Sequence, residues 1–489
     1  MHSLTELLLE RAGEQRLSIT LVANPPLCLS FAAWIERAAR MADWLQARTE
    51  VGQVVFLIGD TQADLLVALL GCWWSGCVPC CWPPPARLMQ GDGYAAALQR
   101  AVTAVRPQLG LGDGRLLGRL EAVPLEGGWW PLDVSGQRPA EARLGAEMGL
   151  LQFSSGTTFE PKPIWLSQTN LLAQLEAIAS LLPGGRQGHS CCSWLPLHHD
   201  MGLVGCLLSA LYAPGDLTLL TPMQFALRPG MWLDWVERSR STITVGPNFA
   251  LEQLLARDPG GERQLHQVQR FLVGSEWVRP ATLRRFHEVY AGQGLAWEAL
   301  TPVYGLAENT LAVTFSQGPK IRSFELAEGR REIVSLGRPV AGVELRLLDD
   351  EGREVAEGQV GRLHVAGPCL AAHLPSPYDT GDLGLLWQCE LYYTGRSKDV
   401  LVHQGVKYSP EVLESLLSGH ECAAIMSPEE VPTLVVEQPR RGELSLDELR
   451  TRLVEAPFSP ELRLVEAGWL PRTSSGKLSR VQARRKLWP

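Results

Sequence analysis

The stretch Gln152-Phe-Ser-Ser-Gly-Thr-Thr-Phe-Glu-Pro-Lys162 (QFSSGTTFEPK) is the most informative segment of the chain. Its apolar start predicts the end of a strand, and the small hydroxyl residues around Gly156 predict a loop. Backbone N–H and side-chain O–H groups in such a loop can converge on phosphate oxygens, and Lys162 adds a positive charge. A plain Ser/Thr turn is the alternative interpretation of this segment alone. The segment is not a P-loop, because the spacing G-x-x-x-x-G-K-[ST] is absent.

The composition is typical of a folded globular protein and excludes some partners. The chain has 489 residues, of which 45% are hydrophobic and 20% are charged. Its length predicts about two to four folding units. The 45 Lys and Arg residues against 53 Asp and Glu residues give a formal charge of -8. This balance argues against a nucleic acid or an anionic membrane as a partner, since both require a basic surface.

The eleven cysteines and the apolar segments bear on the cellular compartment. An odd cysteine count indicates a reducing compartment with free thiols. Cys72, Cys77, Cys80 and Cys81 cluster without a second CxxC or a His pair, which favours buried thiols over a zinc site. The uncharged stretch Leu65–Ala86 is long enough for a membrane span, but its glycines and prolines favour a buried helix, turn and strand. We expect a cytoplasmic protein without a membrane span.

Short apolar runs alternate with amphipathic helical stretches over most of the chain, as in α/β proteins. Strands are expected at 54–58, 193–195, 242–245 and 267–273, and helices at 60–70 and 282–290. The runs 343–348 and 360–365 predict antiparallel strands joined by tight turns. Near the C-terminus we expect helices at 410–417 and 445–454, strands at 433–436 and 462–466, and a final helix. The predicted fold class is a large multi-subdomain N-terminal α/β body, residues 1–395, with a small mobile C-terminal α+β cap, residues 396–489.

Further short motifs follow in order along the chain. Trp194–Gly202 (WLPLHHDMG) contains two adjacent histidines, but one carboxylate and no third ligand at a useful spacing argue against a metal site. The others are YGLAE at 304–308, TGDLG at 380–384, GRSKD at 395–399 and PRTSSGK at 471–477. Each alone is a weak loop signal. Lys477 alone would be interpreted as a solvated surface lysine.

The ordered set resembles the adenylate-forming superfamily, which contains acyl-CoA synthetases, acyl-AMP ligases, nonribosomal adenylation domains and luciferases. The resemblance extends from LGCWWSGCVP at 70–79 to Lys477. It is closest to the fatty acyl-AMP ligases in four segments: LPLHHDMGLVG (195–205), GPNFALE (246–252), VGSEWVRPATLRRF (273–286) and YGLAENTLAV (304–313). It implies that ATP and Mg²⁺ are used to convert a carboxylic acid, fatty or otherwise apolar, into an acyl-adenylate with release of pyrophosphate. The acyl group would then pass to the phosphopantetheine thiol of an acyl carrier protein.

The resemblance also implies roles for individual residues of the body. Tyr304 and the adjoining Gly305 would bind the nucleotide with Tyr304 against adenine, while Asp382 would accept both ribose hydroxyls with Arg396 assisting. Glu308 would bind Mg²⁺, a hard cation that suits a carboxylate and phosphate oxygens. The other side of adenine would be lined by Gly274, Ser275 and Glu276. The phosphates would be held by Ser154, Ser155, Gly156, Thr157, Thr158 and Lys162.

Three further residues receive catalytic or hinge roles from the resemblance. Lys477 would bridge the attacking carboxylate and the α-phosphate and stabilise the transition state by its charge. His199 would lie near the reacting carboxylate and line the acyl pocket. Lys398 falls at the hinge about which the cap turns between adenylation and thiol transfer.

The sequence departs from the family pattern at two places. Phe159 and Pro163 stand where the phosphate loop usually has glycine. The connection Gly367–Thr380 (GPCLAAHLPSPYDT) is shorter than in the family, where it carries the segment tied to rejection of coenzyme A. An acyl-CoA ligase is therefore the first alternative function. A catalytically degenerate homologue that binds nucleotide without turnover is the second.

Overall fold

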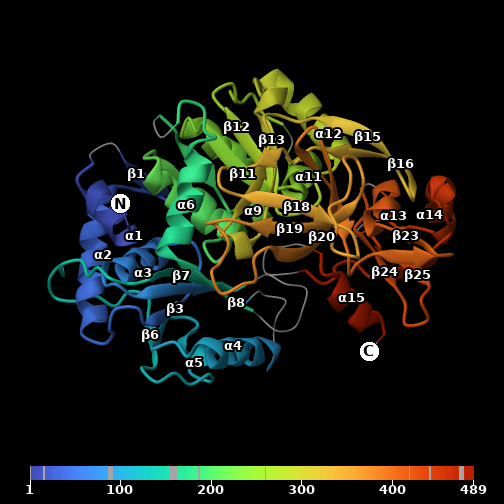
Figure 1. Cartoon of the computed structure of the whole chain (residues 1–489). Coiled ribbons are helices and arrows are strands. Elements are labelled where there is room, and N and C mark those ends of the chain that lie inside the picture. Colours follow the sequence, from blue (N-terminus) through green and yellow to red (C-terminus); the bar gives the residue numbers. More distant parts are fainter. Residues whose placement is uncertain are drawn as a thin grey trace.

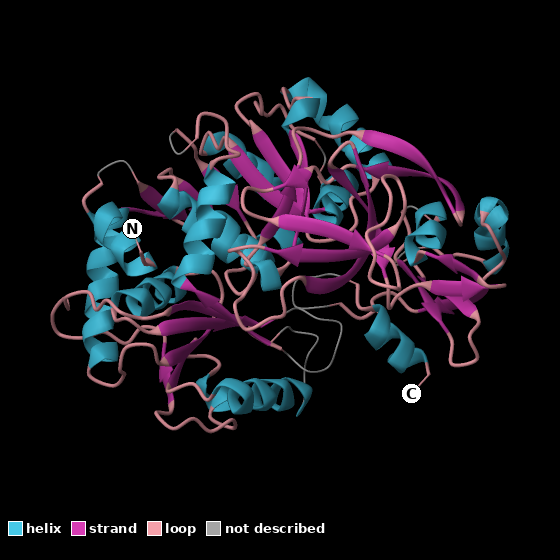
Figure 2. Ribbon diagram, in the orientation of Figure 1, coloured by secondary structure: helices cyan, strands magenta, loops and turns pink. Residues whose placement is uncertain are grey.

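The computed structural model describes residues 2–14, 17–85, 92–153, 162–185, 188–258, 260–417, 419–439, 442–472 and 478–488 (Figure 1). It begins with helix α1 (Leu4–Ala12), which Ser3 caps by accepting a hydrogen bond from the Glu6 amide. Figure 2 shows sheets flanked by helices over most of the chain, and a smaller group of strands and helices near the C-terminus. The mixed α/β class predicted from the sequence is therefore confirmed.

A nine-stranded sheet forms the centre of the body, in the order β17-β14-β13-β12-β11-β9-β10-β1-β2. Its central strands β1, β10, β9, β11, β12 and β13 run parallel to one another, while the pairs β1–β2, β13–β14 and β14–β17 are antiparallel. Every residue of β11 is buried, as expected for a strand covered on both faces. The strand bounds are β1 Ser18–Leu21, β2 Leu27–Ser30, β9 Cys191–Ser193, β10 Leu217–Leu219, β11 Ile243–Pro247, β12 Arg270–Gly274, β13 Leu300–Gly305, β14 Ala312–Phe315 and β17 Arg338–Pro339.

Helices from several parts of the chain pack against this sheet. A π-helical turn, Leu203–Leu208, links two short helices after β9, and π turns are frequent at functional sites. The helix bounds are α6 Gln168–Ala179, α7 Asp200–Gly202, α8 Ser209–Tyr212, α9 Pro222–Leu227, α10 Gly230–Arg238, α11 Asn248–Arg257 and α12 Pro280–Tyr290.

A smaller parallel sheet, ordered β4-β3-β5-β6, lies beside the large one. One of its faces packs on α4 through Phe56 and Leu98, and the other, which includes Val55, joins the large core. The predicted helix-turn-strand of Leu65–Ala86 is confirmed by α3 and β4, up to Pro85, where this described stretch ends. The bounds are α2 Phe31–Gln46, β3 Val54–Ile58, α3 Ala63–Trp74, β4 Val78–Trp82, α4 Asp92–Val105, β5 Leu109–Gly112, α5 Leu117–Leu120 and β6 Trp129–Pro131.

Three antiparallel units complete the body. The hairpin β7–β8 (Met148–Phe153 and Pro163–Ser167) frames the segment 154–161, which lies outside the described residues. The hairpin β15–β16 (Ile321–Leu326 and Gly329–Val334) is tied to α12 by two hydrogen bonds from Arg284 to Glu332. A four-stranded sheet consists of β18 Glu344–Leu348, β19 Gly361–Ala366, β20 Tyr378–Trp387 and β21 Glu390–Arg396.

The cap has its own sheet, β24-β25-β26, and its own apolar clusters. Leu413, Leu434 and Leu449 are fully buried in one of these clusters. The proposed boundary at residue 395 falls one residue before the end of β21, and it stays a prediction. The bounds are β22 Leu401–His403, β23 Val406–Tyr408, α13 Pro410–Leu416, β24 Cys422–Met426, β25 Pro432–Glu437, α14 Leu446–Arg452, β26 Glu461–Val465 and α15 Arg480–Leu487.

The sequence located most elements, with three corrections. The helix expected at 60–70 begins at Ala63 and continues to Trp74, because Gly71 packs closely on Met41 without breaking the helix. The strand expected at 193–195 is β9, which ends at Ser193. Strands β18 and β19 pair as expected, but the connection 349–360 is longer than a tight turn.

Candidate active site

Asp382 on β20 is the best-defined polar residue of the candidate site. Its side chain is buried, with the Tyr304 hydroxyl donating to Oδ2 at 2.7 Å and Arg396 Nε donating to Oδ1 at 3.1 Å. Arg396 is its cross-strand partner, since residues 382 and 396 are paired in the β20–β21 ladder. Burial raises the pKa of Asp382, and the charge of Arg396 and the Tyr304 hydroxyl oppose this shift. Each carboxylate oxygen retains a lone pair for a further donor.

Tyr304 and Gly305 end strand β13 beside this carboxylate. Burial raises the pKa of Tyr304 well above its ordinary value, so the phenol is a hydrogen-bond donor at neutral pH. The Tyr393 ring lies roughly parallel, with centroids 6.4 Å apart. A Cβ atom at Gly305 would lie 2.0 Å from the Leu311 carbonyl oxygen, so only glycine fits at this turn. The site residue Gly305 therefore also has a packing reason to be glycine.

Glu308 lies on the single helical turn Ala307–Asn309 that follows β13. Burial raises the pKa of Glu308, and the negative charges of Asp200 and Asp382 act in the same direction against that of Arg396. Its backbone carbonyl accepts a hydrogen bond from the Ala371 amide at 2.9 Å. No group of three or more metal-ligating side chains occurs among the described residues. Within the described ranges, Glu308 therefore belongs to no metal site built from protein side chains alone.

The short connection after β19 packs directly on this region. Asn170 Nδ2 donates to the carbonyl oxygens of Pro368 and Leu370, at 2.7 and 2.9 Å. Thr310 donates to the Cys369 carbonyl oxygen at 2.6 Å. Together with the bond from Ala371 to Glu308, these contacts hold the shortened connection against the turn that carries the glutamate.

Gly274 ends β12, and Ser275 and Glu276, which follow it, contact two other parts of the site. Ser275 has a φ of 69°, and its hydroxyl donates to the Met201 sulfur at 2.6 Å. The Glu276 carboxylate accepts a hydrogen bond from the Phe249 amide at the start of α11. A Cβ atom at Gly274 would lie 2.7 Å from the Val303 carbonyl oxygen, which explains the glycine.

His199 immediately precedes helix α7 and is nearly buried. Its Nδ1 lies 2.9 Å from Asp200 Oδ1, and since a carboxylate only accepts, Nδ1 donates in this contact. Its Nε2 is buried and has no hydrogen-bond partner among the described residues. A buried nitrogen in this state is costly unless a ligand or water satisfies it. His199 therefore has one ring nitrogen oriented by protein and one available to a ligand.

Two predicted site lysines, Lys162 and Lys398, lie in the described part of the chain. Lys162 is exposed just before β8, while Lys398 lies in the turn between β21 and β22. Burial lowers the pKa of Lys398, and the positive charges of Arg396 and Lys162 contribute to this effect against Asp399 and Asp382. Lys398, the predicted hinge lysine, and Lys162, the lysine of the predicted phosphate loop, therefore lie within electrostatic reach of each other.

The remaining predicted residues lie outside the described part of the chain. These are Ser154, Ser155, Gly156, Thr157, Thr158 and Lys477, together with Phe159. The base of the segment before Lys477 is described: Arg472 and Leu478 form a β-bridge, and the Ser479 amide donates to the Pro471 carbonyl oxygen at 2.9 Å.

The structure thus brings together Tyr304, Asp382 and Arg396 by direct contact. Glu308, Asp200 and Lys398 lie within electrostatic reach of this group. Sequence reasoning missed Tyr378, whose hydroxyl lies 3.5 Å from Glu308 Oε1, and Tyr393, which lies beside Tyr304. Their only sequence signal was proximity to the TGDLG and GRSKD motifs.

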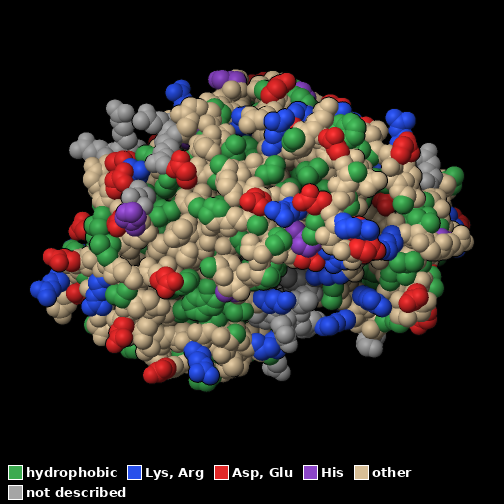
Figure 3. All heavy atoms as spheres, in the orientation of Figure 1, with side chains coloured by type: hydrophobic (Ala, Val, Ile, Leu, Met, Phe, Trp, Pro, Cys, Tyr) green, Lys and Arg blue, Asp and Glu red, His purple; other side chains and the backbone are tan. Residues whose placement is uncertain are grey.

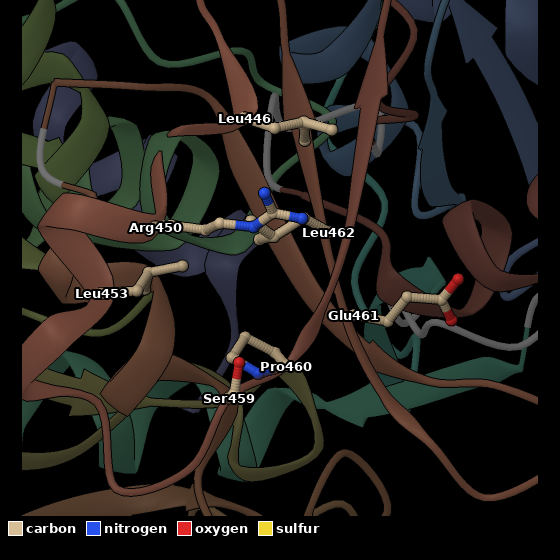
Figure 4. Close-up of a pocket in the computed structure, with 7 residues that line it drawn as sticks. All are labelled: Leu446, Arg450, Leu453, Ser459, Pro460, Glu461 and Leu462. Carbon is tan, nitrogen blue, oxygen red and sulfur yellow. The ribbon is translucent and has the colours of Figure 1, made fainter. Parts of the chain in front are cut away.

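Figure 4 shows a pocket of about 310 Å³ in the cap, away from these residues. All of its lining side chains come from the range 446–462, and Leu446, Arg450 and Leu453 belong to α14 or the turn after it. A second pocket, of about 460 Å³, lies between the β15–β16 hairpin and Trp387. Neither pocket includes a predicted site residue.

Comparison with known proteins identifies the class of protein to which this fold and site belong. The AMP-binding enzyme family matches residues 9–373, and the chain belongs to this family. It is a member of the adenylate-forming superfamily close to the fatty acyl-AMP ligases, and its relatives support an AMP-forming ligase that activates an acid. No helix in the described ranges has the length and apolar character required to cross a membrane.

Particular relatives and one structure match nearly the whole chain. A putative acyl-CoA synthetase of Caulobacter vibrioides is 29% identical over 89% of this chain and 86% of its own length. The medium-chain-fatty-acid–[acyl-carrier-protein] ligase JamA of Moorena producens is 28% identical over 535 aligned positions, which cover 94% of this chain and 89% of JamA. A structure from a study of fatty acyl-adenylate ligases of E. coli and L. pneumophila has a TM-score of 0.88 and 26% identity, covering 100% of this chain and 98% of that one.

Proposed function

We propose that the protein activates a fatty or other apolar carboxylic acid with ATP, forming an acyl-adenylate and pyrophosphate, and then transfers the acyl group to the phosphopantetheine thiol of an acyl carrier protein. The observation that carries the first step is the buried Asp382 carboxylate, held by Tyr304 and Arg396. A buried carboxylate with spare lone pairs fits the paired hydroxyls of a ribose.

The residues around Asp382 fit a nucleotide in further respects. Tyr304 would lie against adenine, and the adjacent strand ends carry Gly274 and Gly305, where close packing leaves no room for a side chain. Glu308 would hold Mg²⁺, which when bound neutralises phosphate charge. Lys162 would contact the phosphates together with Ser154, Ser155, Gly156, Thr157 and Thr158.

His199 and Lys477 are proposed to act on the acid. Because Nδ1 of His199 donates to Asp200, the unpartnered Nε2 would donate to the acid's carboxylate in the imidazolium form, in which both ring nitrogens carry protons. Lys477 would place its charge between the carboxylate and the α-phosphate, where negative charge develops. Its loop would arrive from the cap, which we propose turns about Lys398.

A basic surface on the cap supports an acidic carrier protein as the acceptor. The exposed side chains of Arg484, Arg485 and Lys486 lie on α15, directly after the segment that carries Lys477. Figure 3 shows Lys and Arg side chains gathered near the C-terminal end of this face. Against a net charge of -8, such a local cluster favours an acidic partner. JamA, a relative, acts on an acyl carrier protein by name.

Coenzyme A is the alternative acceptor. The alignment with JamA spans 535 positions, more than the 489 residues of this chain, so JamA contains segments that this chain lacks. From the family pattern, we expect the connection held against Glu308 to be one place where such a segment is missing. Another relative is described as a putative acyl-CoA synthetase.

One experiment tests both steps. The protein is incubated with ATP, Mg²⁺ and octanoic, decanoic, dodecanoic or palmitic acid, and acid-dependent pyrophosphate release is measured. We expect release with at least one acid, followed by acyl transfer to a holo acyl carrier protein and not to coenzyme A. Transfer to coenzyme A alone would replace the carrier proposal. Nucleotide binding without release for any acid would favour the degenerate homologue.

A further inference from the structure

The side chain of Arg480 is the centre of a buried ion cluster in the cap. Its Nε and one terminal nitrogen donate to the two oxygens of Glu414, at 3.0 and 2.7 Å, and the same terminal nitrogen donates to Glu411 at 2.9 Å. Asp399 lies 3.6 Å from the other terminal nitrogen. The paired bonds to Glu414 fix both the position and the plane of the guanidinium.

The two glutamates of this cluster are more buried than the arginine. The side chain of Glu414 is 3% exposed and that of Glu411 is 8% exposed. Glu414 also accepts a hydrogen bond from the Ala424 amide at 2.9 Å, and Ser409 donates to Glu411. Burial alone would raise the pKa of Glu411, but the Arg480 charge and Ser409 hold it below its ordinary value. Loss of Arg480 would therefore leave these buried carboxylates without the cation that donates hydrogen bonds to them.

Arg480 lies at the foot of the segment that carries Lys477, three residues further along the chain. The described base of that segment is closed by the Arg472–Leu478 bridge and the bond from Ser479 to Pro471. Arg480 joins this base to α13 through Glu411 and Glu414. Through Asp399, Arg480 also joins this base to the turn that contains Lys398.

The body supplies positive charge to the same two glutamates. Arg331 on β16 acts with Arg480 in lowering the pKa of Glu411. Burial lowers the pKa of Arg279, before α12, but the charges of Glu252 and Glu414 raise it above its ordinary value. In this orientation of the cap, three arginines therefore balance Asp399, Glu411 and Glu414. Rotation of the cap away from the body would leave Arg480 as the one arginine of this set still beside them.

We propose that Arg480 is a positioning residue for adenylation: its hold on Glu411 and Glu414 fixes the base of the segment from which Lys477 reaches the reacting groups. This inference rests on the role given to Lys477 in the proposed function. Arg480 itself contacts no substrate, and it acts by limiting the positions that the lysine can take.

A double-mutant cycle tests whether Arg480 acts through Lys477. Acid-dependent pyrophosphate release is measured for the wild type, Arg480→Ala, Lys477→Ala and the double variant, with ATP, Mg²⁺ and the best acid of the panel. We expect Arg480→Ala to lower kcat by at least about tenfold, with KM for ATP and acid changed less than about threefold. In the Lys477→Ala background, the same substitution should change the residual rate by less than about twofold.

Arg480→Lys and Arg450→Ala are the companion variants. The lysine keeps the buried charge without the paired bonds, so it should fold with a melting temperature near that of the wild type and a kcat between those of the wild type and Arg480→Ala. Arg450 is an exposed arginine on α14 of the same cap, paired with Asp447 at 3.1 Å, and its loss should leave kcat unchanged.

Two outcomes would overturn the inference, and they differ from failure of the proposed function. Wild-type kcat in folded Arg480→Ala and Arg480→Lys would exclude a positioning role. An equal loss with and without Lys477 would show that Arg480 acts by another route. If Lys477→Ala itself left adenylation unchanged, the role of the lysine in the proposed function would be wrong, whatever Arg480 does.

Discussion

The Tyr304 hydroxyl donates to Asp382 at 2.7 Å, and this bond joins two different sheets. Tyr304 ends β13 of the nine-stranded sheet, while Asp382 lies on β20 of the four-stranded antiparallel sheet. The residues are 78 positions apart in the chain. The candidate nucleotide site therefore lies at a seam, and its geometry depends on how the two sheets pack.

This bond predicts the effect of removing the Tyr304 hydroxyl. Tyr304→Phe keeps the ring but leaves the buried Asp382 carboxylate with one donor fewer, so we expect Kd for ATP to rise by about tenfold with the ring packing unchanged. Isothermal titration with ATP, compared between the variant and the wild type, checks this. Unchanged affinity would show that Arg396 alone keeps Asp382 in place.

The state of Asp382 predicts a dependence on pH. Burial raises its pKa, so its carboxylate takes up a proton at a higher pH than an exposed aspartate does. The ionised form accepts the ribose hydroxyls, and ATP affinity should therefore weaken as the pH falls towards this raised pKa. Asp382→Asn should lower affinity at neutral pH by at least about tenfold and remove this part of the pH dependence. The same pH dependence in the variant and the wild type would assign it to another group.

The role proposed for Lys477 predicts a separation of rate from binding. Lys477→Ala should lower kcat for acid-dependent pyrophosphate release by about 10²–10³-fold, because charge stabilisation in the transition state is lost. The affinity for ATP should change little, since Lys162 and residues 154–158 would still contact the phosphates. A large loss of ATP affinity with little change in rate would contradict this role.

The basic surface of α15 predicts a selective effect on acyl transfer. Reversal of charge at Arg484 and Arg485 to Glu should slow transfer to holo acyl carrier protein by about tenfold or more, and raising the salt concentration should reduce the difference from the wild type. Pyrophosphate release provides the internal comparison, because it requires no carrier. Equal transfer rates at low salt would remove α15 from the docking surface.

The thiols give a prediction that requires no substrate. Cys28 and Cys389 are exposed, Cys422 is half-buried, and the other eight cysteines are buried. Burial raises the pKa of Cys81 to about 12, so its thiolate is scarce at neutral pH. Mass spectrometry after brief alkylation of the folded protein should locate the label at Cys28 and Cys389. Early labelling of the Cys72–Cys81 group would show that α3 and β4 open readily.

The sequence predicted the superfamily because short motifs kept their order along the chain, and it predicted many elements from their apolar runs. Helix α12 and strands β3, β18 and β19 agree with expectation, because the apolar positions of the local sequence pattern are the ones that the fold buries there. Asp200 and Tyr378 were missed as neighbours of Glu308, since their approach depends on the packing of separate elements. The cluster around Arg480 was missed for the same reason. The roles of Lys477 and the loop from Ser154 to Thr158 stay predictions.

Arg396 is the last residue of β21 and also the charged partner of Asp382, and Lys398 follows two residues later. If the cap turns at Lys398 as proposed, the turn begins two residues from the arginine that holds Asp382. The strength with which the body binds a nucleotide and the direction in which the cap faces would then be coupled. In an enzyme with two successive half-reactions, such a link would make departure of the spent nucleotide depend on the same movement that exchanges one set of reacting groups for the next.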